Sequence, residues 1–570
     1  MSQATTNAEI AAAFEEIADI LDLKGDNPFK IRAYRRAAQL IAGFEKPMAE
    51  VERLEDLPGI GKELAEKIRI LVRGEPLPTL EKLRSEVAPG LLELLRVRGL
   101  GPKRVKELHE RLGINGLADL EQALAEHRVQ ALKGFGAKLE AEMGKGIAAH
   151  KQHQQRTRLD LARAEATAIV DYLKKAKGVE QIEPAGSLRR WLETVGDLDI
   201  LVSGRESGPV MERFVNYSKV KEVLAQGDTK SSVVLRSGLQ VDLRFLQPAS
   251  FGAGLYYFTG SKGHNIAVRK LAKAKGWKVS EYGVFKGSKR LAGETEAEIF
   301  KLFSLDFIPP ELREDRGEIE AARKGKLPEL IELKDLKGDL QVHSRASDGQ
   351  SSLAELLDKA RSLGYIYLGV TDHSPSQRQA NGLSPKRIKK QIAEIRKLNE
   401  RLRGFTLWAG AEVDILKDGG LDYPEPLLKQ LDLVLAAIHA HFNLSVAEQT
   451  QRVVKAIQTG RVHILGHPST RLIGERDGIE LDWEPIVQAC RKHNVAVEIN
   501  ASPHRLDVNG ERARALKEAG VKLVISTDAH SLSGLNEMIY GVYTARRGWI
   551  EAQEVINTWP AEKLSKWLKR

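Results

Sequence analysis

Two aspartates, Asp197 and Asp199, stand two residues apart at the start of an apolar run that alternates as a strand does. Residues i and i+2 of a strand share a face, so both carboxylates project to the same side. Parallel carboxylates repel each other unless divalent cations lie between them, and Mg²⁺ prefers hard oxygen ligands. A second strand-like run, 239–245, offers a third carboxylate, Asp242. The pattern predicts a two-metal nucleotidyl-transfer site, although an aspartate pair alone is also compatible with a solvated strand face.

A glycine, a serine and two arginines precede the aspartate strand. Gly186 and Ser187 predict a tight loop that brings a backbone N–H group and a hydroxyl to a phosphate, and Arg189 and Arg190 can add charge-assisted hydrogen bonds. Together with the three aspartates, this segment resembles the palm of family X DNA polymerases. The resemblance implies two Mg²⁺ or Mn²⁺ ions on the aspartates, and a dNTP triphosphate at Gly186, Ser187 and Arg190.

The resemblance to family X continues after the palm and covers residues 7 to about 315. Tyr257, Phe258 and Gly260 lie in a Tyr-Phe-Thr-Gly segment that in the family turns against the incoming sugar. On the helix that follows, Asn265 and Arg269 match residues that look toward the minor groove, Asn265 beside the nucleotide and Arg269 on DNA. Adjacent aromatic residues are also typical of core packing.

The first 150 residues read as short amphipathic helices broken by glycines. A glycine–apolar–glycine sequence recurs three times between helical segments and resembles the helix-hairpin-helix motif, which aims N–H groups of a helix at a phosphate. For the first two copies, the resemblance implies DNA contacts at Gly59, Gly61, Lys62, Gly99, Gly101 and Lys103. For the third copy, 133–138, an ordinary helix cap is the preferred interpretation.

The N-terminal helices also resemble the small lyase domain of DNA polymerase β. That resemblance implies a Schiff-base nucleophile at Lys67 and phosphate contacts at Lys30, Tyr34 and Arg35. A nucleophilic lysine must be partly neutral, whereas Glu63 lies one turn away on the same helix face and should keep Lys67 charged. A purely cationic DNA contact is therefore the preferred interpretation of Lys67.

Beyond residue 337 the apolar pattern changes. Runs of strand length alternate with helical stretches, which is typical of parallel βα units. The runs are 339–343, 366–370, 407–413, 433–438, 462–465, 495–499 and 523–526. Polar residues follow most of them at once, and in a βα barrel the carboxyl ends of the strands converge on the active site. The sequence therefore predicts a second active site.

Five histidines and three acids at these strand ends indicate metal ions, because imidazole and carboxylate together suit Zn²⁺ or Mn²⁺. The constellation resembles the PHP domain, a distorted seven-stranded barrel that binds up to three metals and hydrolyses phosphoesters. The resemblance implies ligands at Gln341, His343, Asp348, His373, Glu412, His439, His467, Asp528 and His530. The family has histidine where this chain has Gln341, which puts one metal position in question.

Composition is compatible with these assignments. The chain has 570 residues, too many for one core, and a net charge of +10 that suits a polyanionic partner. Its one cysteine, Cys490, lies in an apolar-periodic run, so we expect it in a core in a reducing compartment. We expect a cytoplasmic monomer that binds gapped or primer–template DNA and dNTPs and has no membrane contact.

The expected fold is multidomain, α plus α/β, with helical domains, a nucleotidyltransferase palm with thumb, and a seven-stranded barrel. The expected domains are 1–85 (lyase-like), 86–155 (fingers-like), 156–250 (palm), 251–315 (thumb), 316–336 (a charged linker) and 337–570 (PHP). The resemblance implies a polymerase that fills short gaps in DNA repair, with a 3'-5' exonuclease and an abasic-site endonuclease as activities of the PHP domain. The alternative is a PHP domain that is structural or positions DNA.

Overall fold

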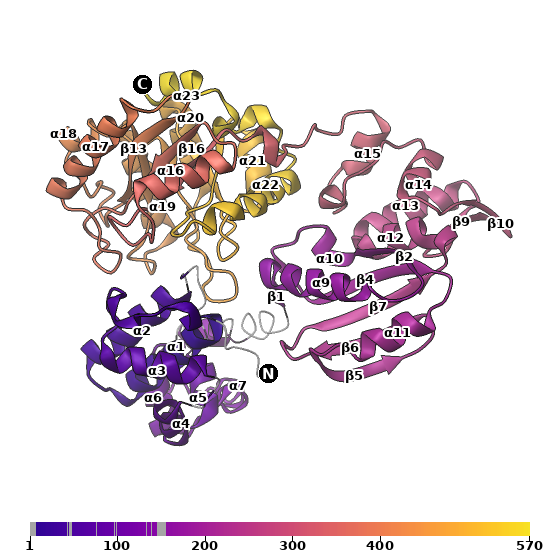
Figure 1. Cartoon of the computed structure of the whole chain (residues 1–570), viewed down its shortest axis with the longest axis horizontal. Coiled ribbons are helices and arrows are strands. Elements are labelled where there is room, and N and C mark those ends of the chain that lie inside the picture. Colours follow the sequence, from indigo (N-terminus) through magenta and orange to yellow (C-terminus); the bar gives the residue numbers. More distant parts are fainter. Residues whose placement is uncertain are drawn as a thin grey trace. The chain divides into compact units, whose positions relative to one another are not determined.

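The computed structural model describes residues 7–569 except 43, 45–47, 74, 76, 96, 98–99, 133, 138, 145–146 and 148–155. The chain divides into two compact units, one of residues 1–154 with the short segments Gly474–Asp477 and His530–Ser533 and one of the remaining residues, and each is described by itself (Figure 1). No helix within the described residues is long and apolar enough to cross a membrane.

The N-terminal unit is helical, as predicted. Its apolar faces form two cores, one centred on Phe14 and Ile68 and one on Leu94 and Leu108. Glycine precedes three of its described helices, because the N-caps of α3, α6 and α7 are Gly61, Gly101 and Gly116. The described helices are α1 Asn7–Lys24, α2 Pro28–Ala42, α3 Lys62–Val72, α4 Pro78–Ser85, α5 Pro89–Leu94, α6 Pro102–Leu112 and α7 Leu117–Ala125, with 3₁₀ turns at Met48–Glu50 and Leu54–Asp56.

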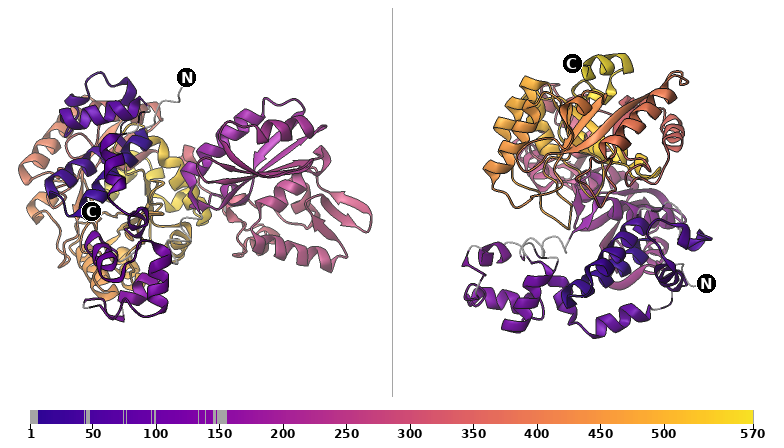
Figure 2. Two further views of the ribbon diagram at one scale, coloured as in Figure 1. Left: turned by 90° about the horizontal axis from the view of Figure 1, so that it is seen from below. Right: turned by 90° about the vertical axis from the view of Figure 1, so that its left-hand side faces the viewer.

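The second unit begins with a five-stranded sheet in the order β2-β4-β7-β6-β5, in which only β4 and β7 are parallel neighbours. The left view of Figure 2 shows these strands as one twisted sheet. Strands β1 and β3 form a separate two-stranded sheet. The elements are β1 Thr157–Arg158, α9 Leu159–Leu173, β2 Val179–Pro184, α10 Gly186–Arg189, β3 Thr194–Val195, β4 Asp197–Gly204, α11 Gly208–Val215, β5 Val220–Gln226, β6 Lys230–Leu235 and β7 Gln240–Leu246.

The alternation of β4 decides which face carries the carboxylates. Leu198, Ile200 and Val202 point into the core formed with α9 and α11. Leu201 points to the other face, where it packs with Leu246 and Phe251. Asp197 and Asp199 share that second face by period, at the end of the strand where the cover of apolar side chains stops.

Helices and a small sheet follow the palm. The elements are α12 Phe251–Thr259, α13 Lys262–Ala274, β8 Lys278–Ser280, β9 Gly283–Lys286, β10 Lys289–Ala292 and α14 Glu296–Leu302, with 3₁₀ turns at Pro248–Ser250 and Pro310–Leu312. Tyr256, which directly precedes the Tyr-Phe-Thr-Gly segment, is buried in the core of this part. The residues that connect it to the barrel were expected to be a charged linker. They contain the short helix α15 Glu318–Arg323 and a 3₁₀ turn Leu333–Asp335, and Glu318 is fully buried.

Seven parallel strands form the C-terminal sheet in chain order, β11 to β17, as the apolar runs predicted. Its two edges meet, because the His343 N–H group donates to the Ala529 carbonyl and the Asp528 N–H group to the Gln341 carbonyl. The sheet is therefore a nearly closed barrel, and the fold class predicted from the sequence is confirmed. The strands are β11 Gly338–Val342, β12 Tyr367–Val370, β13 Thr406–Asp414, β14 Leu433–Ala437, β15 Ile464–Leu465, β16 Ala496–Asn500 and β17 Leu523–Ser526.

Helices surround the barrel strands, as Figures 1 and 2 show. Cys490 is buried in α20, as expected. The helices are α16 Leu353–Ser362, α17 Pro385–Asn399, α18 Glu425–Leu428, α19 Val446–Gln458, α20 Trp483–His493, α21 Gly510–Glu518, α22 Met538–Arg547 and α23 Ala561–Leu568, with 3₁₀ turns at Gly534–Glu537, Ala552–Glu554 and Ile556–Thr558.

Candidate active sites

The palm strands bring the predicted carboxylates onto one face. Asp199 on β4 is the register partner of Asp242 on β7, and Asp197 precedes Asp199 on the same face. Burial, and then the charge of Asp197, raises the pKa of Asp199 to about 6. Burial raises the pKa of Asp242, but hydrogen bonds, first of all the one from Lys230, lower it by more. The pKa of Asp242 therefore lies below its usual value. The Lys230 ammonium lies 2.8 Å from Asp242.

The three palm carboxylates do not lie close enough together to form a group of metal-ligand atoms within 4.8 Å of one another. Within the described part of the chain, the groups of three or more His, Asp and Glu ligand atoms that lie within 4.8 Å of one another are all in the barrel. The strand register places the aspartates side by side, and a cation between them would offset their repulsion.

The glycine-serine segment forms one short helical turn, α10, where the sequence predicted a loop. Gly186 has φ +62°, and a Cβ atom there would lie 2.6 Å from a carboxylate oxygen of Asp199. The Ala185 N–H group donates to the Asp199 carbonyl at 2.8 Å, which ties the turn to the aspartate strand. Glycine is therefore required where this turn meets Asp199, and the half-buried Ser187 follows directly.

The two arginines after the turn have different partners. Arg189 makes a two-pronged ion pair with the carboxylate of Glu296 at 2.7 and 2.9 Å, so its charge is already neutralised. Arg190 donates to the carbonyl of Thr259 and, at 3.0 Å, to Glu314. Both arginines are therefore ion-paired within the protein, and their contact with a phosphate stays a prediction.

The residues expected beside the nucleotide sugar lie at the end of α12 and on α13. The half-buried rings of Tyr257 and Phe258 meet edge to face at 5.2 Å, and Gly260 ends α12 with φ +70°. The Asn265 amide donates to the Tyr257 carbonyl at 2.7 Å, and its own buried oxygen accepts no hydrogen bond. Arg269 is exposed one turn further along α13, which is the placement the sequence predicted.

The hairpin glycines occupy helix starts in the N-terminal unit. Gly59 has φ +83°, in the left-handed region that favours glycine, and Lys62 is the exposed first residue of α3. Lys103 is exposed at the start of α6, directly after Pro102. Gly99, predicted to contact DNA, lies outside the described residues, as do both lysines of the third copy.

The residues expected around a lyase phosphate are committed to other contacts. Tyr34 is buried in the helical core, and Lys30 is exposed beside Asp26 at 3.4 Å. Arg35 lies within 4.0 Å of three carboxylates, those of Glu15, Asp19 and Asp22. Its charge is therefore offset inside the unit.

Lys67 is buried and paired with Glu63. Burial lowers the pKa of Lys67, but hydrogen bonds with Glu63 and Tyr34 raise it more, so the pKa lies above its usual value. This confirms the expectation that Glu63 keeps the ammonium charged.

We expect weak borohydride trapping of the protein on a 5'-deoxyribose phosphate end, because a Schiff base needs the neutral amine. Glu63→Lys should strengthen trapping several-fold by lowering the Lys67 pKa through like-charge repulsion, and Lys67→Ala should remove it. Trapping should also rise with pH, since deprotonation of Lys67 requires a pH near or above its raised pKa. Lys82→Ala on the exposed face of α4 is the matched control. Equal adduct yields from wild type and Lys67→Ala would assign the activity to another amine.

In the barrel, Glu412 lies at the centre of four imidazoles. Its Oε1 atom is 2.8 Å from His467 and 3.1 Å from His439, and its Oε2 atom is 3.1 Å from His373 and 3.4 Å from His343. Burial raises the pKa of Glu412, but the neighbouring histidines lower it well below its usual value. A carboxylate with both oxygens surrounded in this way can bridge two metal ions.

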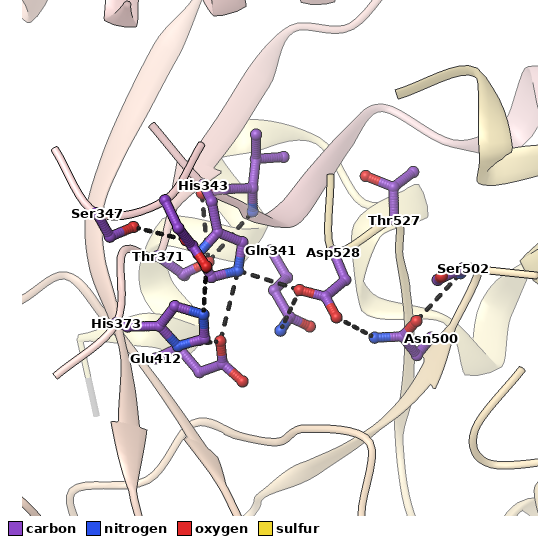
Figure 3. Close-up of polar contacts among 12 residues, drawn as sticks. Gln341, His343, Ser347, Thr371, His373, Glu412, Asn500, Ser502, Thr527 and Asp528 are labelled. Carbon is purple, nitrogen blue, oxygen red and sulfur yellow. Dashed lines mark hydrogen bonds and ion pairs between the residues drawn. The ribbon is translucent and has the colours of Figure 1, made fainter. Parts of the chain in front are cut away.

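Asp528 forms the other side of this cluster (Figure 3). Its Oδ1 atom lies 3.0 Å from His343 Nε2 and accepts from the Gln341 amide at 3.2 Å, and its Oδ2 atom accepts from Asn500 at 3.2 Å. The amide oxygen of Gln341 is buried and accepts no hydrogen bond, so it is available to a cation.

Three overlapping sets of ligand atoms lie within 4.8 Å of one another. They are His343–Asp348–His373–His530, His373–Glu412–His439 and His343–Glu412–Asp528. His467 is in none of these sets, although it contacts Glu412. Nitrogen and oxygen donors in this mixture fit Zn²⁺ or Mn²⁺, and shared ligands suit a cluster of ions better than separate sites.

Comparisons with known proteins agree with this architecture. Family models match at residues 5–75 (helix-hairpin-helix domain), 91–143 (SAM-like helix-hairpin-helix tandem), 254–314 (DNA polymerase beta thumb) and 339–502 (PHP domain). The DNA polymerase/3'-5' exonuclease PolX of Bacillus subtilis (strain 168) is 38% identical over 566 residues, 99% of this chain and 99% of that protein. The chain belongs to the family X DNA polymerases that carry a PHP domain. Membership implies dependence on divalent metal ions.

Two further relatives match about two fifths of the chain. A probable phosphatase of Shewanella piezotolerans is 31% identical over 232 residues, 39% of this chain and 89% of that protein. A probable phosphatase of Thermoanaerobacter sp. (strain X514) is 27% identical over 242 residues, 40% of this chain and 94% of that protein.

Sequence reasoning missed residues that support the PHP ligands. Asp414 hydrogen-bonds His439 Nδ1; burial lowers the pKa of His439, but Glu412 and Asp414 raise it to about 10. Glu498 is fully buried, accepts from the His467 N–H group at 2.7 Å, and has its pKa raised by burial. The Asp414 carboxylate behind His439 fixes the orientation of that ring, whereas Glu498 holds the backbone of His467. The sequence did carry a signal for Asp414, because Asp414 stands two residues after Glu412 on the same strand.

Proposed function

We propose that this family X polymerase fills short gaps during DNA repair, and that its PHP domain hydrolyses DNA from the 3' end and at abasic sites. The observation that carries the polymerase part is the register of β4 on β7, which sets Asp199 beside Asp242 on the face that also carries Asp197. The glycine turn that touches Asp199 stands next to these carboxylates, where a triphosphate must lie for transfer.

In the palm, we assign Asp197, Asp199 and Asp242 as ligands of two Mg²⁺ or Mn²⁺ ions. These ions neutralise charge on the phosphates and on the attacking oxygen when they are bound. Asp242 lies on the primer side, Ser187 and Arg190 bind the triphosphate with Gly186, and Tyr257, Phe258, Gly260 and Asn265 surround the sugar. Gly186 and Gly260, each with positive φ, let the backbone approach the nucleotide closely.

We assign the contacts with the DNA backbone to the hairpins. Helix starts at Gly61 and Gly101 direct N–H groups outward beside exposed Lys62 and Lys103, which suits contacts that carry position without sequence. Arg269 on α13 would reach the minor groove. We also propose the domain boundaries predicted from the sequence, which lie at residues 85, 155, 250, 315 and 336.

In the PHP domain, we assign up to three Zn²⁺ or Mn²⁺ ions to the nine residues predicted from the sequence. The three overlapping ligand sets support a multinuclear cluster, which would activate water against a phosphodiester. A second candidate is a structural or DNA-positioning PHP domain, and the observation that favours it is Gln341 in place of a histidine.

One assay separates these proposals. A labelled primer on a one-nucleotide gap is incubated with and without dNTPs in Mg²⁺, Mn²⁺ or Zn²⁺. We expect extension when dNTPs are present and shortening from the 3' end when they are absent. Extension without shortening under any metal would favour the positioning role of the PHP domain, and shortening without extension would contradict the palm assignment.

Gln341 should bias the PHP domain toward Mn²⁺, because carbonyl oxygen suits Mn²⁺ whereas Zn²⁺ prefers imidazole. We expect Gln341→His to raise bound Zn²⁺ per chain without changing primer extension, as measured by metal analysis of the purified full chain. Gln488→His on α20, away from the cluster, is the matched control. An unchanged Zn²⁺ content in Gln341→His would show that this side chain does not reach the ions.

A further inference from the structure

Helix α22 of the PHP domain contacts the palm at the nucleotide turn. It follows the loop that carries Asp528 and His530, after a 3₁₀ turn at Gly534–Glu537. Tyr540, Tyr543 and Arg547 recur along one face of α22 at helical spacing. The two tyrosines pack against the hydrophobic core of the palm. One helix of the barrel is therefore part of the packing of the polymerase domain.

Arg547 holds the backbone of the proposed triphosphate turn. Its guanidinium donates to the carbonyl oxygen of Arg190 at 2.7 Å and to Glu314 at 3.1 Å. The same Glu314 oxygen accepts from the Arg190 side chain at 3.0 Å. Arg547 and Glu314 therefore hold Arg190 together. Arg547, a residue of the barrel, binds its main chain, and Glu314 binds its side chain.

Trp191, the next residue, adds a second contact with α22. It has φ +55°, a conformation that bulky side chains rarely adopt. Its ring stacks on Tyr543 with centroids 3.6 Å apart and planes 8° from parallel, and the Arg163 guanidinium lies 3.7 Å from its centroid. These contacts offset the backbone strain and keep the chain in the conformation that presents Arg190.

We propose that Arg547 and Tyr543 are positioning residues for the polymerase reaction, which fix the Arg190–Trp191 turn so that the Arg190 side chain is preorganised for the triphosphate of the incoming dNTP. The inference rests on the proposed role of Arg190. It makes dNTP affinity a property of palm and barrel together, and it assigns α22 a function in synthesis that is independent of hydrolysis in the metal cluster.

Steady-state incorporation into a one-nucleotide gap tests this on the full chain. Arg547→Met should raise KM for dNTP by about tenfold with kcat within about twofold, because an interaction that preorganises the ground-state site is lost. Tyr543→Ala should act in the same direction, whereas Tyr543→Phe, which keeps the stacking ring, should stay near wild type. Shortening of the primer without dNTPs should not change in any of these variants.

Arg491→Met, which removes an exposed arginine near the end of α20, is the matched control and should change neither activity. The proposal is overturned if Arg547→Met and Tyr543→Ala leave KM for dNTP within about twofold of wild type. It is also overturned if extension and shortening fall together in both variants, since that indicates general support of the fold. Arg190→Met separates this inference from the proposed function. An unchanged KM in Arg190→Met contradicts the nucleotide role itself, whereas a raised KM there with a normal Arg547→Met contradicts only the role of α22.

Discussion

Replacing Asp242 with alanine is expected to reduce primer extension by at least about a thousandfold, because it removes the carboxylate that we assign to the primer side of the proposed two-metal site. The fold should survive the change. Asp242 lies near the start of β7 beside Lys230 and Arg244, and both of these side chains reach solvent once their partner is removed. Gel-based extension on a one-nucleotide gap measures the effect, and DNA binding should remain near the wild-type level because the hairpins carry it.

Asp171→Ala is the matched control for this experiment. Asp171 is an exposed aspartate on α9, the helix that packs against the opposite face of the sheet. Extension in Asp171→Ala should equal that of wild type. If Asp242→Ala extended primers at the wild-type rate, the palm assignment would be wrong, and the in-register pair of Asp199 and Asp242 would be a feature of the strand surface alone.

The sequence predicted the fold where local pattern decides structure. The seven barrel strands follow apolar runs because a strand buried on both faces needs continuous apolar residues. Asp197 and Asp199 were predicted on one face because the strand period is two, and the register of β4 on β7 then added Asp242. The family resemblance is confirmed, and it supplied roles that periodicity alone does not provide.

The sequence failed where partners come from distant segments. Nothing near Arg189 indicates that Glu296, 107 residues away, neutralises it. Nothing near Arg35 indicates that three carboxylates of α1 surround it. Residues 316–336 were expected to be a charged linker, but Glu318 within them is fully buried and lies 2.8 Å from the His264 imidazole. In each case the partner comes from another segment of the chain, and for Glu318 the contact accompanies full burial.

The same limit applies to α22. Its tyrosines and arginine read locally as one face of an amphipathic helix, and the local pattern does not name the surface they cover. Only the fold shows that Trp191 and the Arg190 carbonyl lie under them. Through these contacts the barrel packs against the palm, although the two domains catalyse separate reactions.

Glu412→Gln is expected to abolish shortening of a primer and to lower the metal content of the protein, while extension with dNTPs remains. The amide keeps the shape of the side chain but loses the negative charge, which lies between four imidazoles and belongs to two of the three ligand sets. A loss of one bridging carboxylate should therefore affect two ion positions at once. We expect a rate of hydrolysis lower by about a thousandfold.

Metal analysis of the full chain, together with 3' shortening and extension on the same gap, measures these effects. Glu562→Gln on α23, an exposed glutamate paired only along its own helix with Lys566, is the control and should keep both activities and the metal content. A Glu412→Gln protein that retained its metal and its shortening rate would place the ions away from Glu412. If Glu412→Gln lost its metal but the wild-type protein did not shorten a primer either, the PHP domain would have a structural or positioning role. Because extension depends on the separate aspartates of the palm, its survival in Glu412→Gln would also show that the chain is folded, so the loss of hydrolysis can be attributed to the cluster.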